Sequence, residues 1–109
     1  YIHLHGTATR ANDSIEDKAV HSVFGLSTPC SSTKGWTGHT LGAAGVTGAV
    51  IAAMCLTHSF VPGTLNTTRI DPYLKSHVRL ENRDQPVRRV LNNSFGFGGN
   101  NCSLIFGTV

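Results

Sequence analysis

Apolar and polar side chains alternate over the first five residues, Tyr1–His5, and the alternation stops at Gly6. A period of two is typical of a β-strand with one buried face. We therefore predict a strand at the start of the chain that carries His5 at its carboxyl end.

The period then changes to that of an amphipathic helix. Asp13 is followed three residues later by Glu16, which is the spacing of a capping box. Apolar residues share one helical stripe that ends before Gly25, namely Ile15, Ala19, Val20, Val23 and Phe24. The pattern predicts a helix from Asp13 to Phe24 that is closed by Gly25.

The middle of the chain is apolar or small on every side. Pro29 interrupts the preceding pattern, and the segment Cys30–Thr33 favours a short strand. A longer apolar stretch, Gly38–His58, predicts a helix buried inside a layered fold. Three glycines at a spacing of three leave one side of this helix flat enough for another backbone to approach, namely Gly42, Gly45 and Gly48.

The last third combines a polar connection with two strands. Pro62 begins an extended segment, and residues 71–84 are charged and contain proline, as is typical of a surface connection. Val87–Ser94 and Asn101–Gly107 have the pattern of strands, and the glycines between them predict a tight turn. The order βαβαββ predicts an α/β fold with a layered sheet, forming one domain over residues 1–109.

Composition narrows the possible classes of function. Only 14% of the residues are charged, so we expect much of the surface to face other protein. The net charge of +3 is modest, and the Lys and Arg residues form no stripe with interleaved aromatics, which argues against nucleic-acid binding. The chain begins without an initiator Met and ends on an apolar run, and we expect it to be a piece of a larger protein.

Cysteine spacing and hydropathy bear on redox state and location. Cys30, Cys55 and Cys102 are odd in number and far apart, so we expect reduced thiols in a cytoplasmic protein. The six histidines form no metal-binding motif, and we predict no metal. No signal peptide opens the chain. The uncharged stretch Leu41–Leu56 is shorter than the roughly 20 residues of a membrane span, so we expect none.

Two histidines stand beside glycines at element boundaries. His5 opens the motif HGTAT, and His39 lies within TGHTLG. Two imidazoles that each keep a ring N–H can donate to one oxygen, which suits stabilisation of an enolate or oxyanion. The alternative is a histidine satisfied by backbone carbonyls, and we keep it for the other four histidines, His3, His21, His58 and His77.

Two further features have a functional and a structural interpretation. Lys34, if half-buried, needs an anionic partner, and Glu16 is the nearest candidate, although a solvated lysine is the alternative. Residues 93–99, NSFGFGG, lack the ending of a phosphate-binding loop. Their backbone N–H groups could face a reacting carbonyl between the walls of Phe95 and Phe97, or the two rings could simply pack.

Three motifs occur in one order along the chain: HGTAT from His5, KGWTGHTLGAAG from Lys34 and NSFGFGG from Asn93. Together they resemble the C-terminal half of β-ketoacyl-[acyl-carrier-protein] synthases, condensing enzymes of the thiolase-like superfamily. The resemblance implies a thiolase-like fold and an acyltransferase of fatty acid biosynthesis. In its decarboxylative Claisen condensation, the enolate formed from malonyl-carrier protein attacks an acyl group held on a cysteine.

The resemblance also implies roles for single residues. His5 and His39 match the histidines that stabilise the enolate, and Lys34 matches the lysine that organises their site. Asp13 and Glu16 match acidic residues that support it.

The same resemblance implies substrate contacts. Phe97 matches a gating phenylalanine whose N–H helps to form the oxyanion hole for the acyl-cysteine, with Phe95 and Gly96 beside it. Thr7 and Thr9 match hydroxyls near the pantetheine arm.

None of the three cysteines occupies the family's nucleophile motif, which lies upstream. We therefore expect the isolated chain to be inactive. The implied partners are the acyl carrier protein and the N-terminal half of the same enzyme, whose full-length form is expected to be a homodimer. No cofactor is implied beyond the phosphopantetheine that carries the substrates.

The chain departs from the family pattern in two places. Residues 10–12, Arg-Ala-Asn, replace small residues, so the substrate entrance could differ, and Gly48 stands where a Glu is common, which leaves a structural monovalent cation open. Ala8 and the pair Asp13-Ser14 favour the discrete fatty-acid type over a polyketide-type ketosynthase domain. A non-catalytic partner resembling a chain-length factor is the other alternative, and the retained histidines and lysine argue against it.

Overall fold

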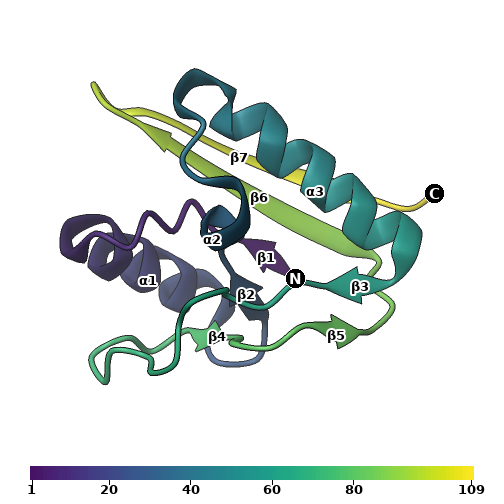
Figure 1. The fold of residues 1–109 in the computed structure, drawn as a ribbon, viewed down its shortest axis with the longest axis horizontal. Helices are drawn as coiled ribbons and strands as arrows, with labels where there is room; N and C mark the ends of the chain where they lie inside the picture. Colours follow the sequence, from purple (N-terminus) through teal and green to yellow (C-terminus); the bar gives the residue numbers. More distant parts are fainter.

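The computed structural model describes residues 1–109 and contains a five-stranded mixed sheet (Figure 1). Strand β1 (Ile2–His3) lies at its centre, in the order β4-β2-β1-β6-β7. The other strands are β2 (Pro29–Ser31), β4 (His77–Val78), β6 (Arg89–Gly96) and β7 (Asn100–Gly107). All neighbours are parallel except β6 and β7, which form an antiparallel hairpin. The predicted α/β sheet is confirmed.

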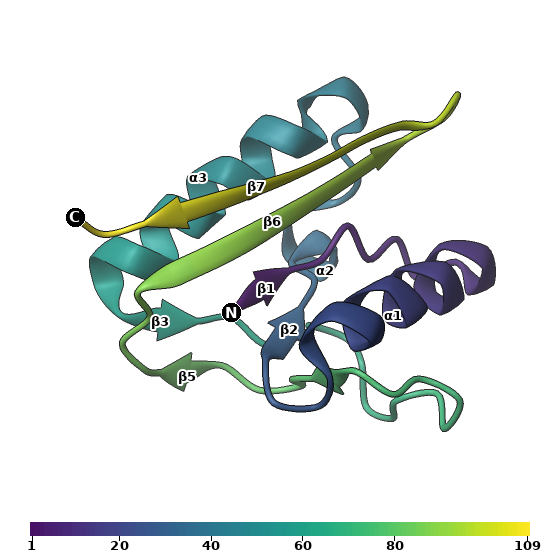
Figure 2. The same ribbon diagram turned by 180° about the vertical axis from the view of Figure 1, so that it is seen from behind.

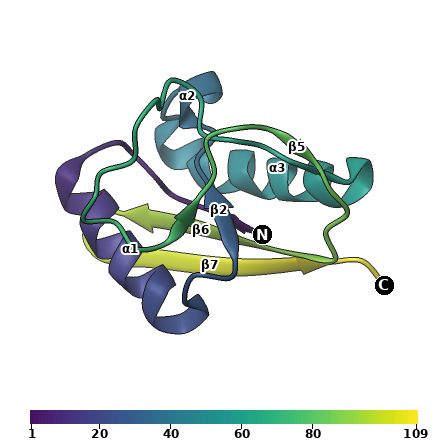
Figure 3. The same ribbon diagram turned by 90° about the horizontal axis from the view of Figure 1, so that it is seen from below.

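Two longer helices lie on opposite faces of this sheet (Figures 2 and 3). They are α1 (Arg10–Phe24) and α3 (Ala44–His58). The short helix α2 (Lys34–Thr37) and a 3-10 turn, η1 (Leu41–Ala43), precede α3. A small antiparallel sheet joins β3 (Phe60–Val61) to β5 (Arg83–Asp84).

Each face of the sheet has its own small apolar core. Ile2, Val20 and Cys30 pack together under α1, whereas Ala52, Cys55 and Val90 pack together under α3. Because side chains of a strand alternate between faces, His3 points away from Ile2 and toward α3, where it meets Asn92. The layered arrangement therefore places the polar end of β1 beside the start of α3.

Helix α1 differs from the prediction at its start and in its buried face. It begins at Arg10, so Asp13 lies inside the first turn and cannot be the N-cap of a capping box. The predicted apolar stripe is only partly buried, because Val20 lies in the core whereas Ile15 is 67% and Val23 is 72% exposed. The face toward the sheet carries two carboxylates that accept backbone N–H groups, Glu16 and Asp17. These hydrogen bonds offset the cost of burying polar groups, which hydrophobic periodicity alone does not register.

Helix α3 is half-buried, and the prediction of a helix buried all round is wrong for this chain. Gly48, Ala52 and Cys55 pack against the sheet, while Val46 and Val50 are more than half exposed on the opposite side. The helix begins at Ala44, later than the predicted Gly38, and together with η1 it covers Leu41–His58, 18 residues of mean hydropathy 1.6. By length and composition alone this segment could cross a membrane, a test that core helices also pass.

The polar connection, residues 71–84, and the turn between β6 and β7 can also be compared with the sequence prediction. Residues 71–84 contain the short strands β4 and β5, which the sequence pattern did not predict. The predicted tight turn is confirmed, because Phe97, Gly98 and Gly99 join β6 to β7. Gly98 and Gly99 both have φ of 83°, a conformation that L-residues with a side chain rarely adopt.

Candidate functional site

The structure brings His5 and His39 together at the end of β1. Their ring centroids are 5.4 Å apart and the rings meet edge to face, with an interplanar angle of 84°. His5 is 6% exposed, whereas His39 is exposed in the loop between α2 and η1. Two residues 34 positions apart in the sequence therefore form one imidazole pair.

The loop geometry fixes the tautomer of His39. The backbone N–H of Leu41 donates to His39 Nδ1 at 3.1 Å. Because Nδ1 accepts this bond, the proton of a neutral ring lies on Nε2. His39 thus presents an Nε2–H donor at the exposed side of the pair.

His5 lies in a poorly solvated place next to Phe95. The two ring centroids are 5.6 Å apart, and His5 Nδ1 is buried without a hydrogen-bond partner in this chain. Burial lowers the pKa of His5 to about 4, and the charges of Lys34 and His39 act in the same direction. His5 is therefore neutral near pH 7 and keeps one ring N–H to donate.

We expect the His5 ring to stay neutral at pH values well below the usual pKa of histidine. Because its folded pKa is lowered from 6.5 to about 4, its contribution to stability is complete above pH 6.5 and is lost as the pH falls toward 4. An NMR titration of the histidine Cε1–H signals, with His5 assigned from its loss in His5→Gln, should give a midpoint near 4. A midpoint near 6.5 would contradict the burial argument.

Glu16 holds the backbone that carries His5. Its Oε1 accepts the His5 N–H and its Oε2 accepts the Gly6 N–H, both at 2.8 Å. The side-chain amides of Asn93 and Asn12 donate to the same carboxylate at 3.2 Å. With 3% exposure and four donors, Glu16 connects α1, the end of β1 and β6.

Lys34 approaches His5 from the other side of the same peptide segment. Its Nζ donates to the His5 carbonyl oxygen, and not to the Glu16 carboxylate as predicted. Burial lowers the pKa of Lys34, and the charge of Glu16 partly offsets this effect. The predicted direct pair is thus replaced by an arrangement in which the peptide groups of His5 lie between the two charges.

The remaining predicted residues occupy two places. Thr7 and Thr9 follow His5 on the same loop, with their hydroxyl oxygens 2.9 Å apart. Phe97 is fully exposed at the tip of the β6–β7 hairpin, next to Gly96. Gly96 does not have a positive φ. The positions of this turn whose backbone conformation requires glycine are therefore Gly98 and Gly99.

Several polar residues of the site were not singled out from the sequence. Asn12 and Asn93 both donate to Glu16, and Ser32 donates to the Gly6 carbonyl at 2.8 Å. Asn93 lies within the motif NSFGFGG, and that position was the available signal. Buried amides are costly unless they are paired, and here they are paired with a carboxylate.

No group of three or more His, Cys, Asp or Glu side chains is clustered. A Cβ on Gly48 would lie 2.2 Å from Asn92 Oδ1, so the Asn92 amide fills the space beside this glycine. Asn92 Oδ1 already faces a ring nitrogen of His3 at 2.8 Å.

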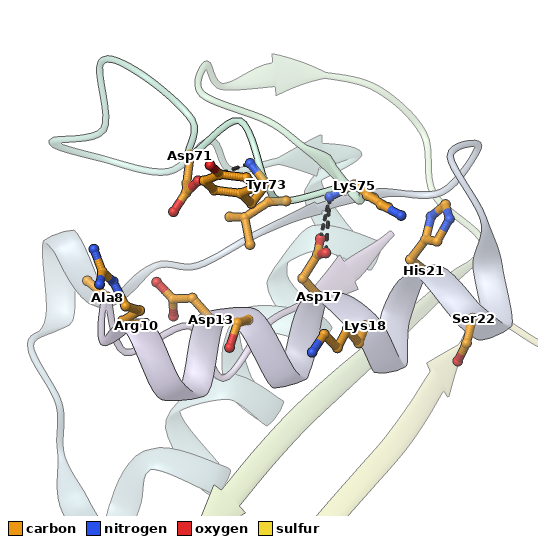
Figure 4. A pocket seen from close by; sticks show the side chains of 12 residues that line it. Ala8, Arg10, Asp13, Asp17, Lys18, His21, Ser22, Asp71, Tyr73 and Lys75 are labelled. Atoms are coloured by element: carbon orange, nitrogen blue, oxygen red, sulfur yellow. Dashed lines mark hydrogen bonds between the residues drawn. The ribbon is translucent and has the colours of Figure 1, made fainter.

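A cavity of about 580 Å³ lies away from the histidine pair, between α1 and the loop that contains Tyr73 (Figure 4). Asp17 reaches across it and accepts the N–H groups of Lys75 and Ser76. Burial raises the pKa of Asp17, but these hydrogen bonds outweigh that effect and hold it below its usual value. The buried carboxylate therefore fastens this loop to the helix.

Comparison with known proteins gives a consistent result. Residues 1–68 match the family described as beta-ketoacyl synthase, C-terminal domain. The 3-oxoacyl-[acyl-carrier-protein] synthase 1 of Escherichia coli (strain K12) is 39% identical over 107 residues, which are 96% of this chain and 26% of that protein. The chain thus spans about a quarter of the length of this relative.

Solved structures agree in fold. The ishigamide ketosynthase/chain length factor matches with a TM-score of 0.94 and 38% identity, over 99% of this chain and 27% of that one. A ketosynthase in complex with its chain length factor from Xenorhabdus doucetiae matches with a TM-score of 0.91 and 45% identity, over 100% of this chain and 28% of that one. Both matches cover the histidine pair and the β6–β7 hairpin, because they span nearly the whole chain.

Proposed function

The chain belongs to the beta-ketoacyl synthase C-terminal domain family, and from this premise we propose that it supplies the enolate-stabilising part of a 3-oxoacyl-[acyl-carrier-protein] synthase. The observation that supports this role is the edge-to-face pair of His5 and His39. One ring is held neutral by burial and the other carries its proton on Nε2, so each can donate one N–H. Two such donors suit one developing oxyanion.

In the proposed reaction, malonyl-carrier protein loses carbon dioxide. The electron pair of the broken carbon–carbon bond moves onto the thioester, and the enolate oxygen accepts the N–H groups of His5 and His39. The enolate carbon then attacks the carbonyl of an acyl-cysteine, a new carbon–carbon bond forms, and the cysteine leaves as thiolate. Lys34 adds a positive charge and helps to keep the His5 ring neutral.

The nucleophilic cysteine of this reaction is proposed to lie outside these residues. Burial raises the pKa of Cys30 to about 12 and that of Cys55 to about 11, so neither provides a reactive thiolate. Cys102 is exposed on β7, but it does not occupy the family's nucleophile motif. Since the chain spans only about a quarter of its E. coli relative, a thiol from the rest of a longer enzyme fits the proposal.

We expect the isolated 109-residue chain to form no β-ketoacyl product, because covalent catalysis needs a thiolate that it lacks. The assay supplies acyl- and malonyl-carrier protein and analyses products and acyl-cysteine adducts by mass spectrometry. A longer protein that contains the chain and an upstream thiol is the control. Turnover through Cys30, Cys55 or Cys102 of the isolated chain would contradict the proposal.

Phe97 is proposed to gate acyl loading, with Phe95 and Gly96 beside it and its N–H serving the oxyanion of the acyl-cysteine. Its exposure leaves the ring free to meet protein or substrate outside this chain. Phe97→Ala should alter the order and selectivity of acyl loading, because the N–H is retained. Gly98→Val should reduce acyl loading more than Phe97→Ala does. The reason is that φ is 83° at position 98, a backbone conformation that valine rarely adopts. Equal loss of thermal stability in both variants, with unchanged loading selectivity, would reduce Phe97 to a packing role.

Several further attributes belong to the same proposal. The acyl carrier protein is the proposed partner, as the name of the E. coli relative suggests, with Thr7 and Thr9 beside its pantetheine arm. We further propose that the full-length enzyme contains an N-terminal half and is a homodimer in the cytoplasm. It needs no cofactor beyond the phosphopantetheine that carries the substrates. A polyketide-type ketosynthase or a chain-length-factor-like partner is the alternative, since the names of related structures include a type II PKS and a chain length factor.

A further inference from the structure

His3 is a buried titratable side chain that the proposed reaction does not use. It is 5% exposed and lies on β1, two residues before His5. Its Nδ1 is 2.8 Å from Asn92 Oδ1, and its Nε2 is 2.8 Å from Thr33 Oγ1. Both ring nitrogens are therefore engaged inside the protein.

The surrounding groups determine which ring nitrogen carries the proton. The Asn92 amide nitrogen donates to the Gly45 carbonyl and to Ser94 Oγ, so its Oδ1 must face His3 as an acceptor. His3 Nδ1 then donates, and Nε2 of the neutral ring accepts the hydroxyl of Thr33. Burial lowers the pKa of His3, which favours this neutral form.

His3 and its two partners touch the three segments that carry His5, Lys34 and His39. His3 shares β1 with the segment leading to His5, and Thr33 immediately precedes Lys34. Asn92 reaches the Gly45 carbonyl in the first turn of α3, just after the loop that carries His39. The His3 imidazole therefore connects the backbone segments that hold His5, Lys34 and His39.

We propose that His3 is a positioning residue that sets the relative placement of His5, Lys34 and the His39 loop through its two hydrogen bonds to Asn92 and Thr33. This inference rests on the proposed function of the site. It predicts that loss of these hydrogen bonds slows the decarboxylation step more than it weakens substrate binding. The reason is that displaced donors stabilise the transition state less well, whereas the substrate is still bound.

The glycine beside Asn92 offers a way to disturb this connection without changing His3. Alanine at position 48 would place its Cβ 2.2 Å from Asn92 Oδ1, so Asn92 must move. Alanine at position 45, one turn earlier on the same face, would meet Ser94 Oγ at an ordinary 3.6 Å. Gly45→Ala is therefore the matched control for Gly48→Ala.

The test uses the full-length synthase that carries this chain and measures carbon dioxide release from malonyl-carrier protein. His3→Leu and Gly48→Ala should each lower kcat by about 100-fold, with KM changed by less than about threefold. His3→Asn keeps a donor at the position of Nδ1 and should recover to within about tenfold of the wild-type kcat. Gly45→Ala should stay near wild type.

A second readout does not depend on activity. The Cε1–H signals of His5 and His39 should shift in His3→Leu and Gly48→Ala and stay in place in Gly45→Ala. Unchanged signals, or an unchanged kcat in variants that fold, would overturn the positioning role even if the wild type releases carbon dioxide. A wild type without carbon dioxide release would instead overturn the proposed function. If His3→Leu does not fold, the comparison of Gly48→Ala with Gly45→Ala decides.

Discussion

Replacing His39 with alanine in the full-length synthase should lower carbon dioxide release from malonyl-carrier protein by about 100- to 1000-fold, because one donor to the enolate oxygen is lost. The effect should be specific to this step. His39 is exposed in this chain, and its only hydrogen bond here is to the Leu41 N–H, so its removal leaves the fold intact. Acyl loading, measured by mass spectrometry on the same samples, should change far less.

His39→Gln is the informative companion variant. Its amide can donate a hydrogen bond, so it should recover part of the activity that His39→Ala loses. His5→Ala should show the same selective loss, although it also removes the contact with Phe95. If carbon dioxide release in His39→Ala stayed near the wild-type rate, His39 would not be one of the donors.

Replacing Glu16 with alanine should destabilise the fold more than any other single change in the site. The variant leaves the N–H groups of His5 and Gly6 and the amide of Asn93 without their acceptor, whereas the Asn12 amide keeps Asp13. Each unsatisfied buried donor costs about 1–3 kcal/mol, so we expect a loss of about 3 kcal/mol or more.

Thermal and denaturant unfolding measure this loss, with Asp13→Ala as the matched control. Asp13 lies one turn earlier on α1 and accepts only one bond, from Asn12, so its variant should stay within about 0.5 kcal/mol of wild type. Equal effects of the two variants would refute the anchoring role of Glu16. In a double-mutant cycle with Lys34→Met, the two sites should be non-additive because both hold the His5 peptide segment.

The sequence predicted the proximity of the two histidines better than the packing around them. Glycine-flanked His5 and His39 were expected to act on one oxygen, and the structure places their rings side by side. Of the stripe that was expected to be buried, Val20 is buried but Ile15 and Val23 are exposed, because the face of α1 that carries Glu16 lies toward the sheet. Periodicity weighs hydrophobicity alone, whereas the energy of a buried carboxylate depends on donors that come from distant segments.

The same limitation explains the other differences. Strands β4 and β5 have two residues each, too few for any periodicity to appear. Lys34 was paired with Glu16 by chain order, yet its ammonium reaches the His5 carbonyl, a backbone group that no sequence motif records. His3 was assigned a satisfied structural role, and its two partners became visible only when β6 and the end of β2 were placed beside β1.

The central claim is that His5 and His39 together stabilise the enolate, while the acyl-accepting thiol lies elsewhere in the enzyme. The most direct measurement is the rate of carbon dioxide release from malonyl-carrier protein by the double variant His5→Ala/His39→Ala, with acyl loading of the same sample as the internal reference. We predict a loss of about 1000-fold or more in carbon dioxide release, with acyl loading largely retained. Carbon dioxide release within about tenfold of wild type, equivalent to only about 1.4 kcal/mol of the barrier, would contradict the account.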